Sequence, residues 1–122
     1  MPDKIAIVDA NKIECLKLQN VLQTGHYESV VLHSLDELDR WLGRARCRTI
    51  IIDLDSLPVD RTYFRNFRQQ HPHISVLCMS QRQFHPELEE AIRENIFACV
   101  NKPVDPEEIG FLLKSVHENR VS

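Results

Sequence analysis

Four polar residues suited to phosphate chemistry follow short apolar segments, either directly or within two positions. A carboxylate can attack a phosphoryl group, and paired carboxylates can bind Mg²⁺. A hydroxyl and an ammonium group can hold phosphoryl oxygens. Any one such residue after a strand is more often a loop residue or a helix cap, so the prediction of a phosphate site depends on all four occurring together. The four residues are Asp9, Asp53, Ser80 and Lys102.

The apolar segments that precede these residues have the pattern of buried strands. They are continuous rather than alternating, which is typical of strands covered on both faces of a sheet. The isoleucine run 50–52 is the clearest case, because it ends in the charged Asp53. Five strands are predicted, at Ile5–Val8, Val30–Leu32, Ile50–Ile52, Val76–Met79 and Phe97–Val100.

Helical patterns separate these strands, and most have recognisable ends. Asn11 with Glu14 and Ser34 with Glu37 have the spacing of capping boxes. Pro106 suits the first turn of the last helix. The helices are predicted to begin near Asn11, Ser34, Asp60, Pro86 and Asp105, and the first two to end at Gly25 and Gly43.

Alternating strands and helices predict a doubly wound α/β domain of (βα)5 type, spanning residues 1–122, with a five-stranded parallel sheet. Ligands of such sheets bind beyond the carboxyl ends of the strands, where the winding direction reverses. The strand order 2-1-3-4-5 would place strands 1 and 3 at that point. We therefore expect Asp53 to be held by a buried strand at the edge of a wet crevice, close to Asp9, Ser80 and Lys102.

Composition excludes several classes of protein. The net charge of −3 gives no general attraction for nucleic acid or anionic membranes, and Arg40, Arg44, Arg46 and Arg48 are interpreted as a solvated face. No apolar run is long enough to span a membrane, and neither GxGxxG nor a P-loop occurs. The four cysteines lack zinc-like spacing, so reduced thiols and a cytoplasmic protein are expected.

The sequence resembles the receiver domains of bacterial two-component response regulators, which have flavodoxin-like topology. The resemblance lies in "IAIVDAN", "IIIDLDSLP", "VLCMS" and "NKPVDPEE", and it covers nearly the whole chain. It implies a phosphorelay signalling domain in which Asp53 accepts phosphate, Ser80 and Lys102 contact the phosphoryl group, and Asp9, Asp53 and the backbone carbonyl of Asp55 bind Mg²⁺.

The resemblance also implies partners. They would be a histidine kinase or a phosphotransfer protein, and a homodimer would form through the fourth helix, the fifth strand and the fifth helix. No membrane or direct nucleic-acid partner is expected. Autodephosphorylation would be the only catalysis, so the protein would not be an enzyme.

Four positions depart from the family pattern. Ala10 replaces the second member of the acidic pair, which should weaken Mg²⁺ binding. Pro58 comes one residue late, which indicates an extra loop residue. Cys99 stands at the aromatic switch position, and Gln81 replaces a small residue. The sequence therefore leaves open whether Asp53 is phosphorylated, and we expect a pocket that is stable without metal.

The sequence also allows other functions. A small phosphatase or other hydrolase on the same fold could use Asp53 as nucleophile, with Asp55 as the general acid. A flavodoxin-like cofactor binder would need a Ser/Thr-rich loop where "DANKIE" stands. Asp55 and Arg82 could form an ion pair over the crevice, or both could be solvated.

Overall fold

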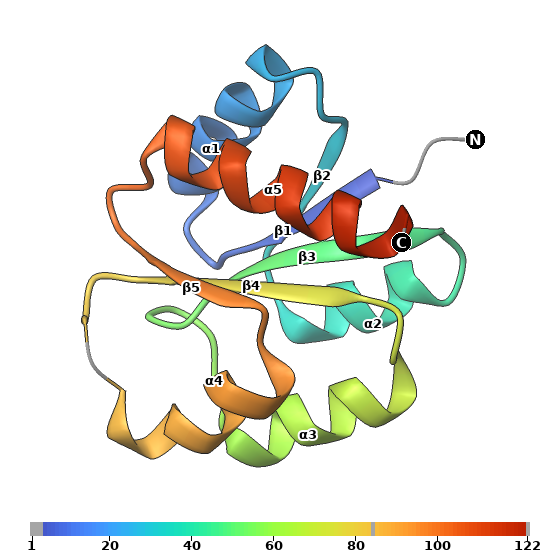
Figure 1. Cartoon of the computed structure of the whole chain (residues 1–122), viewed down its shortest axis with the longest axis vertical. Coiled ribbons are helices and arrows are strands. Elements are labelled where there is room, and N and C mark those ends of the chain that lie inside the picture. The colour runs from blue at the N-terminus through green and yellow to red at the C-terminus, as the bar shows by residue number, and fades with distance from the viewer. Residues whose placement is uncertain (1–3, 84, 122) are drawn as a thin grey trace.

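The computed structural model describes residues 4–83 and 85–121, without the side chains of 118–121. Five parallel strands form one sheet in the order β2-β1-β3-β4-β5, which confirms the predicted fold class and strand order (Figure 1). The strands are β1 (Lys4–Val8), β2 (Ser29–Leu32), β3 (Cys47–Asp53), β4 (Ser75–Ser80) and β5 (Ala98–Asn101).

Helices cover both faces of this sheet. α1 and α5 lie on one face, and α2, α3 and α4 lie on the other (Figure 1). The helices are α1 (Lys12–Thr24), α2 (Leu35–Leu42), α3 (Arg61–Gln70), α4 (Glu89–Asn95) and α5 (Pro106–Val121), and a 3₁₀ turn, η1 (Pro86–Leu88), precedes α4.

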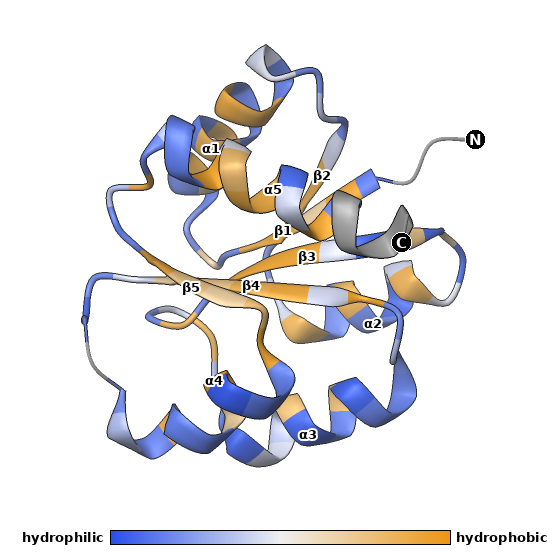
Figure 2. Cartoon of the chain, in the orientation of Figure 1, coloured by the Kyte–Doolittle hydropathy of each residue, from blue (hydrophilic) through white to orange (hydrophobic). Residues whose placement is uncertain are grey.

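Beyond their first residues the central strands are mainly apolar, because both of their faces are buried (Figure 2). Ile50 and Ile52 pack in the core beneath α2, α3 and α4, whereas Ile51 packs in the core beneath α1 and α5. All three are fully buried. The isoleucine run thus anchors Asp53 from both sides of the sheet.

The predicted capping residues begin their helices as expected. Asn11, Ser34 and Asp60 each accept a hydrogen bond from the backbone N–H three residues later. At Ser34 a second bond supports the start of the helix, because the Glu37 carboxylate accepts the N–H of His33, the residue before the cap, at 2.9 Å.

Two predicted boundaries were inexact. The fourth helix opens at Pro86 as a 3₁₀ turn and becomes α-helical at Glu89, and no side chain caps either segment. The fifth strand begins at Ala98, so Phe97 precedes it and remains 40% exposed. In the described part of the chain, no helix is long and apolar enough to cross a membrane.

Candidate functional site

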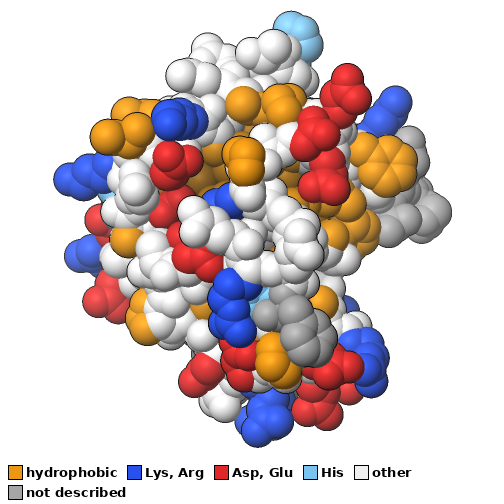
Figure 3. Space-filling model, turned by 90° about the vertical axis from the view of Figure 1, so that its left-hand side faces the viewer, with side chains coloured by type: hydrophobic (Ala, Val, Ile, Leu, Met, Phe, Trp, Pro, Cys, Tyr) orange, Lys and Arg blue, Asp and Glu red, His pale blue; other side chains and the backbone are white. Residues whose placement is uncertain are grey.

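The carboxyl ends of the strands bring the four predicted residues to one edge of the sheet. Val8 of β1 pairs with Ile52 of β3, so Asp9 and Asp53 follow on neighbouring strands. Ser80 ends β4, beside β5, and Lys102 comes just after β5. Asp9, Asp53 and Ser80 are almost completely buried. Figure 3 looks onto this edge, where hydrophobic side chains line a hollow that has acidic side chains around it.

Lys102 joins the acidic groups of the site. Its ammonium group lies 2.6 Å from Oδ1 of Asp53 and 3.0 Å from Oδ2 of Asp55. Burial would lower the pKa of Lys102, but the hydrogen bonds and charges of the two carboxylates outweigh burial and raise it. Lys102 is therefore a fixed cation of the site.

The side chain of Asp55 takes a position that the sequence did not predict. Oδ1 accepts the Ser80 hydroxyl at 2.7 Å, and Oδ2 accepts the Gln81 N–H at 2.8 Å. Burial would raise the pKa of Asp55, but these two bonds and Lys102 together lower it. Asp55 therefore stays ionised and turned inward.

The suggested ion pair between Asp55 and Arg82 was wrong. The Arg82 guanidinium lies 2.9 Å from the Glu87 carboxylate in the next turn of chain. Asp55 is instead bonded to Lys102, Ser80 and Gln81.

Asp9 is held through one oxygen only. Its Oδ1 accepts the Asn11 N–H at 2.9 Å and the Ser56 hydroxyl at 3.1 Å, while its buried Oδ2 has no hydrogen-bond partner among the described residues. Burial raises the pKa of Asp9, the hydrogen bonds of Asn11 and Ser56 lower it, and the nearby charge of Asp53 raises it again; the net shift is upward. Oδ2 is thus an acceptor without a donor.

Ser56 is a site residue that sequence reasoning missed. Besides donating to Asp9, its hydroxyl accepts the Ala10 N–H at 3.1 Å. It therefore ties the loop after β1 to the loop after β3. The sequence feature that pointed to this loop was Pro58, which lies one residue later than in the family pattern and indicated an extra loop residue.

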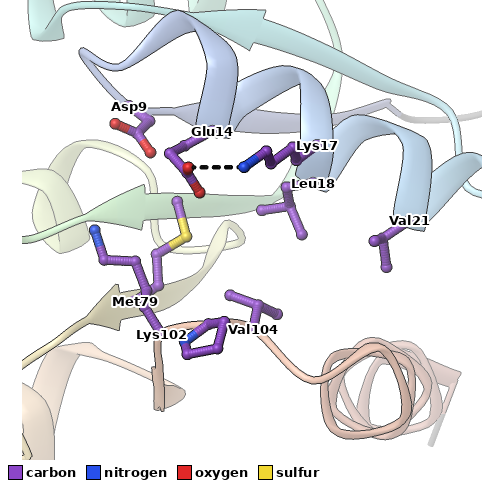
Figure 4. A pocket seen from close by; sticks show the side chains of 9 residues that line it. Asp9, Glu14, Lys17, Leu18, Val21, Met79, Lys102 and Val104 are labelled. Carbon is purple, nitrogen blue, oxygen red and sulfur yellow. Dashed lines mark hydrogen bonds and ion pairs between the residues drawn. The ribbon is translucent and has the colours of Figure 1, made fainter.

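A mainly apolar groove runs from the site between α1 and the chain after β5 (Figure 4). Asp9 and Lys102 lie at one end, and Leu18, Val21 and Val104 line its walls. Glu14 and Lys17 form an ion pair of 3.4 Å on the rim. In the described ranges, no cluster of three or more His, Cys, Asp or Glu side chains could hold a metal ion.

The structure also shows the surroundings of Cys99 and Gln81, the two other positions that depart from the family pattern. Cys99, at the position of the aromatic switch residue, is exposed, whereas Cys78 on the neighbouring strand is buried. Cys99 is exposed because β5 is the edge strand. Gln81 contributes its backbone N–H to Asp55.

No protein-family model and no curated protein sequence matches this chain. Solved structures do match. The signal receiver domain of an HD domain-containing protein from Pseudomonas fluorescens Pf-5 has a TM-score of 0.86 at 20% identity, covering 98% of this chain and 97% of that one.

Two further matches agree in fold. A two-component response regulator from Clostridium difficile has a TM-score of 0.86 at 17% identity, covering 99% of this chain and 100% of that chain. A CheY-like receiver domain protein from Methanospirillum hungatei JF-1 has a TM-score of 0.83 at 13% identity, covering 98% of both chains. This chain has the fold of the receiver domains of response regulators.

Proposed function

We propose that this chain is a signal-transduction receiver domain in which Asp53 accepts a phosphoryl group. The observation that carries the proposal is the 2.6 Å contact between Asp53 and Lys102 at the carboxyl edge of the sheet, with Ser80 on the adjoining strand. A buried strand presents the nucleophile, and a cation and a hydroxyl stand where phosphoryl oxygens would lie.

The transfer would proceed by in-line displacement. An Asp53 carboxylate oxygen attacks the phosphorus, and the bond from phosphorus to the donor atom breaks. That atom is the ring nitrogen of a phosphohistidine, or the acyl oxygen of acetyl phosphate. The bonding electron pair leaves with the donor, and an aspartyl phosphate forms. Lys102 and Ser80 would then hold the phosphoryl oxygens.

The donor set fits a weakly bound Mg²⁺. Asp9 and Asp53 are oxygen ligands, and Oδ2 of Asp9 is buried without a donor, which suits a cation. The backbone carbonyl of Asp55 is proposed as a third ligand. When bound, Mg²⁺ would neutralise charge on the phosphoryl oxygens. Ala10 brings no carboxylate, so affinity should be lower than at a site with a complete acidic pair.

The proposed partners are a histidine kinase or a phosphotransfer protein as phosphodonor, and a second copy through α4, β5 and α5. We propose no multiple-turnover enzyme. The hydrolase alternative needs Asp55 as a proton donor, whereas its hydrogen bonds with Gln81, Ser80 and Lys102 lower its pKa and keep it ionised.

Intact-mass measurement after incubation with acetyl phosphate and Mg²⁺ tests the proposal. We expect a mass gain of one phosphoryl group, lost in Asp53→Asn and retained in Glu94→Gln, which removes an exposed carboxylate on α4. An adduct that persists in Asp53→Asn, or none in the wild type under any donor, would contradict it. Steady turnover of a chromogenic phosphate ester would favour the hydrolase instead.

A further inference from the structure

The Asp55 carboxylate is bound by the groups that should serve a phosphoryl group on Asp53. Three donors from separate positions converge on its two oxygens. These are the Ser80 hydroxyl at 2.7 Å, the Gln81 N–H at 2.8 Å and the Lys102 ammonium at 3.0 Å. A carboxylate with three donors, one of them charged, resembles a bound oxyanion.

The hydroxyl of Ser80 is fully committed to this arrangement. Its oxygen accepts the Arg82 N–H at 3.0 Å, and its proton goes to Asp55. Ser80 is completely buried, so water does not offer it another partner. A phosphoryl group on Asp53 would need that same proton.

The charges also disfavour a phosphoryl group and the Asp55 carboxylate lying in this site together. Lys102 already serves two carboxylates, Asp53 and Asp55. A phosphoryl group on Asp53 would bring further negative charge next to Asp55, and like charges repel strongly in a partly buried site.

We propose that the Asp55 side chain is the resident ligand of the oxyanion-binding site formed by Ser80, Gln81 and Lys102, and that it competes with a phosphoryl group for that site. The inference rests on the proposed function of Asp53. Asp55 can leave the site because it lies on a loop and its side chain is 26% exposed. The Asp55 side chain is therefore the group that phosphorylation would displace.

Titration with beryllofluoride in the presence of Mg²⁺ tests the competition. This phosphoryl analogue forms a Be–O bond to a carboxylate oxygen as a fluoride or water ligand leaves the beryllium, without oxidation or reduction. The Gln81 amide signal in ¹H–¹⁵N NMR spectra of the full chain reports occupancy of the site. We expect Asp55→Ala to bind beryllofluoride at least about tenfold more tightly than wild type, and Asp55→Asn to lie between them.

Glu14→Gln is the matched control. It removes one negative charge from the rim of the same groove, but Glu14 contacts none of the three donors. Its affinity should stay within about twofold of wild type, because the proposal depends on direct occupancy rather than on net charge. Equal tightening in Glu14→Gln and Asp55→Ala would overturn the inference.

The remaining outcomes separate this inference from the proposed function. Equal affinities in wild type and Asp55→Ala, both lost in Asp53→Asn, would overturn the inference and leave the proposed function standing. Binding that needs no Asp53 in any variant would overturn the proposed function, and the inference with it. Without any probe, Asp55→Ala should lose the hydrogen-exchange protection of the Gln81 amide. Unchanged protection would show that the contact is not formed, and would overturn the inference alone.

Discussion

At the scale of single residues, Lys102 balances the acidic groups of the site. Asp53 is 1% exposed, and Lys102 is the cation closest to it among the described residues. A buried carboxylate that loses its only close cation keeps its desolvation cost without the compensating attraction. We therefore expect the metal-free site to depend on Lys102 for its stability.

Lys102→Met should lower the free energy of unfolding by about 3 kcal/mol, because it leaves Asp53 ionised and unpaired. The double variant Lys102→Met, Asp53→Asn should recover most of that loss, since it removes the buried charge as well. Urea unfolding of the wild type, both single variants and the double variant measures this cycle. A Lys102→Met variant within about 0.5 kcal/mol of wild type would contradict the assigned role.

Ionisation of the buried Asp9 carboxylate lowers the stability of the folded state. Asp9→Asn should raise the free energy of unfolding by about 1 kcal/mol at neutral pH, because a neutral amide avoids burying a negative charge beside Asp53. The pKa of Asp9 is raised in the folded state, so the folded protein binds more protons and wild-type stability falls as pH rises through that pKa.

The gain from Asp9→Asn should therefore shrink as pH falls through the raised pKa of Asp9, and it should be lost once pH reaches the ordinary carboxyl range. Thermal unfolding across that range, without metal, measures it. Added Mg²⁺ should stabilise wild type more than the variant, because Oδ2 of Asp9 is a proposed ligand. A gain that is independent of pH would point to packing rather than charge.

At the scale of elements, short helices depend on their caps. α2 has only eight residues, so the hydrogen bonds at its N-terminus provide a large share of its local stability. The Ser34 hydroxyl accepts the Glu37 N–H at 3.1 Å, and the Glu37 carboxylate accepts the His33 N–H at 2.9 Å. α4 has no such cap and follows a 3₁₀ turn.

Ser34→Ala should cost about 1 kcal/mol of stability, since it leaves the Glu37 N–H without its side-chain acceptor. Ser34→Asp is the matched control, because aspartate caps helices equally well and should retain wild-type stability. Chemical denaturation followed by circular dichroism measures both. Equal losses in the two variants would show that Ser34 acts by packing instead.

At the scale of the whole molecule, one sheet separates two apolar cores. The core beneath α2, α3 and α4 contains Ile50, and the core beneath α1 and α5 contains Ile51. The two isoleucines are neighbours in sequence but contact opposite layers. Burial on both faces is what makes β3 a rigid support for Asp53.

Ile50→Ala and Ile51→Ala should each cost about 3–4 kcal/mol, because each leaves a cavity in a fully buried layer. Ile→Val at the same positions should cost about 1 kcal/mol and serves as the control for volume. Equilibrium urea unfolding of the four variants measures the comparison. A small loss at either position would mean that its face is not tightly packed.

The sequence by itself determined the order of strands and helices, most of the caps and the delivery of Asp9, Asp53, Ser80 and Lys102 to one edge. Continuous apolar runs and capping boxes are local signals, and the carboxyl ends of parallel strands always share an edge. These features needed no knowledge of how the loops fold.

Only the tertiary structure decided where the loop side chains point. In the folded chain Asp55 contacts Ser80 and Lys102, and Arg82 forms an ion pair with Glu87. Ser56 donates a hydrogen bond to Asp9, and Cys99 is exposed on an edge strand. Each of these depends on loop conformation or strand position and joins positions that have no fixed spacing. Local sequence patterns do not predict such contacts, because the energy of each contact depends on a partner that becomes a neighbour only when the chain folds.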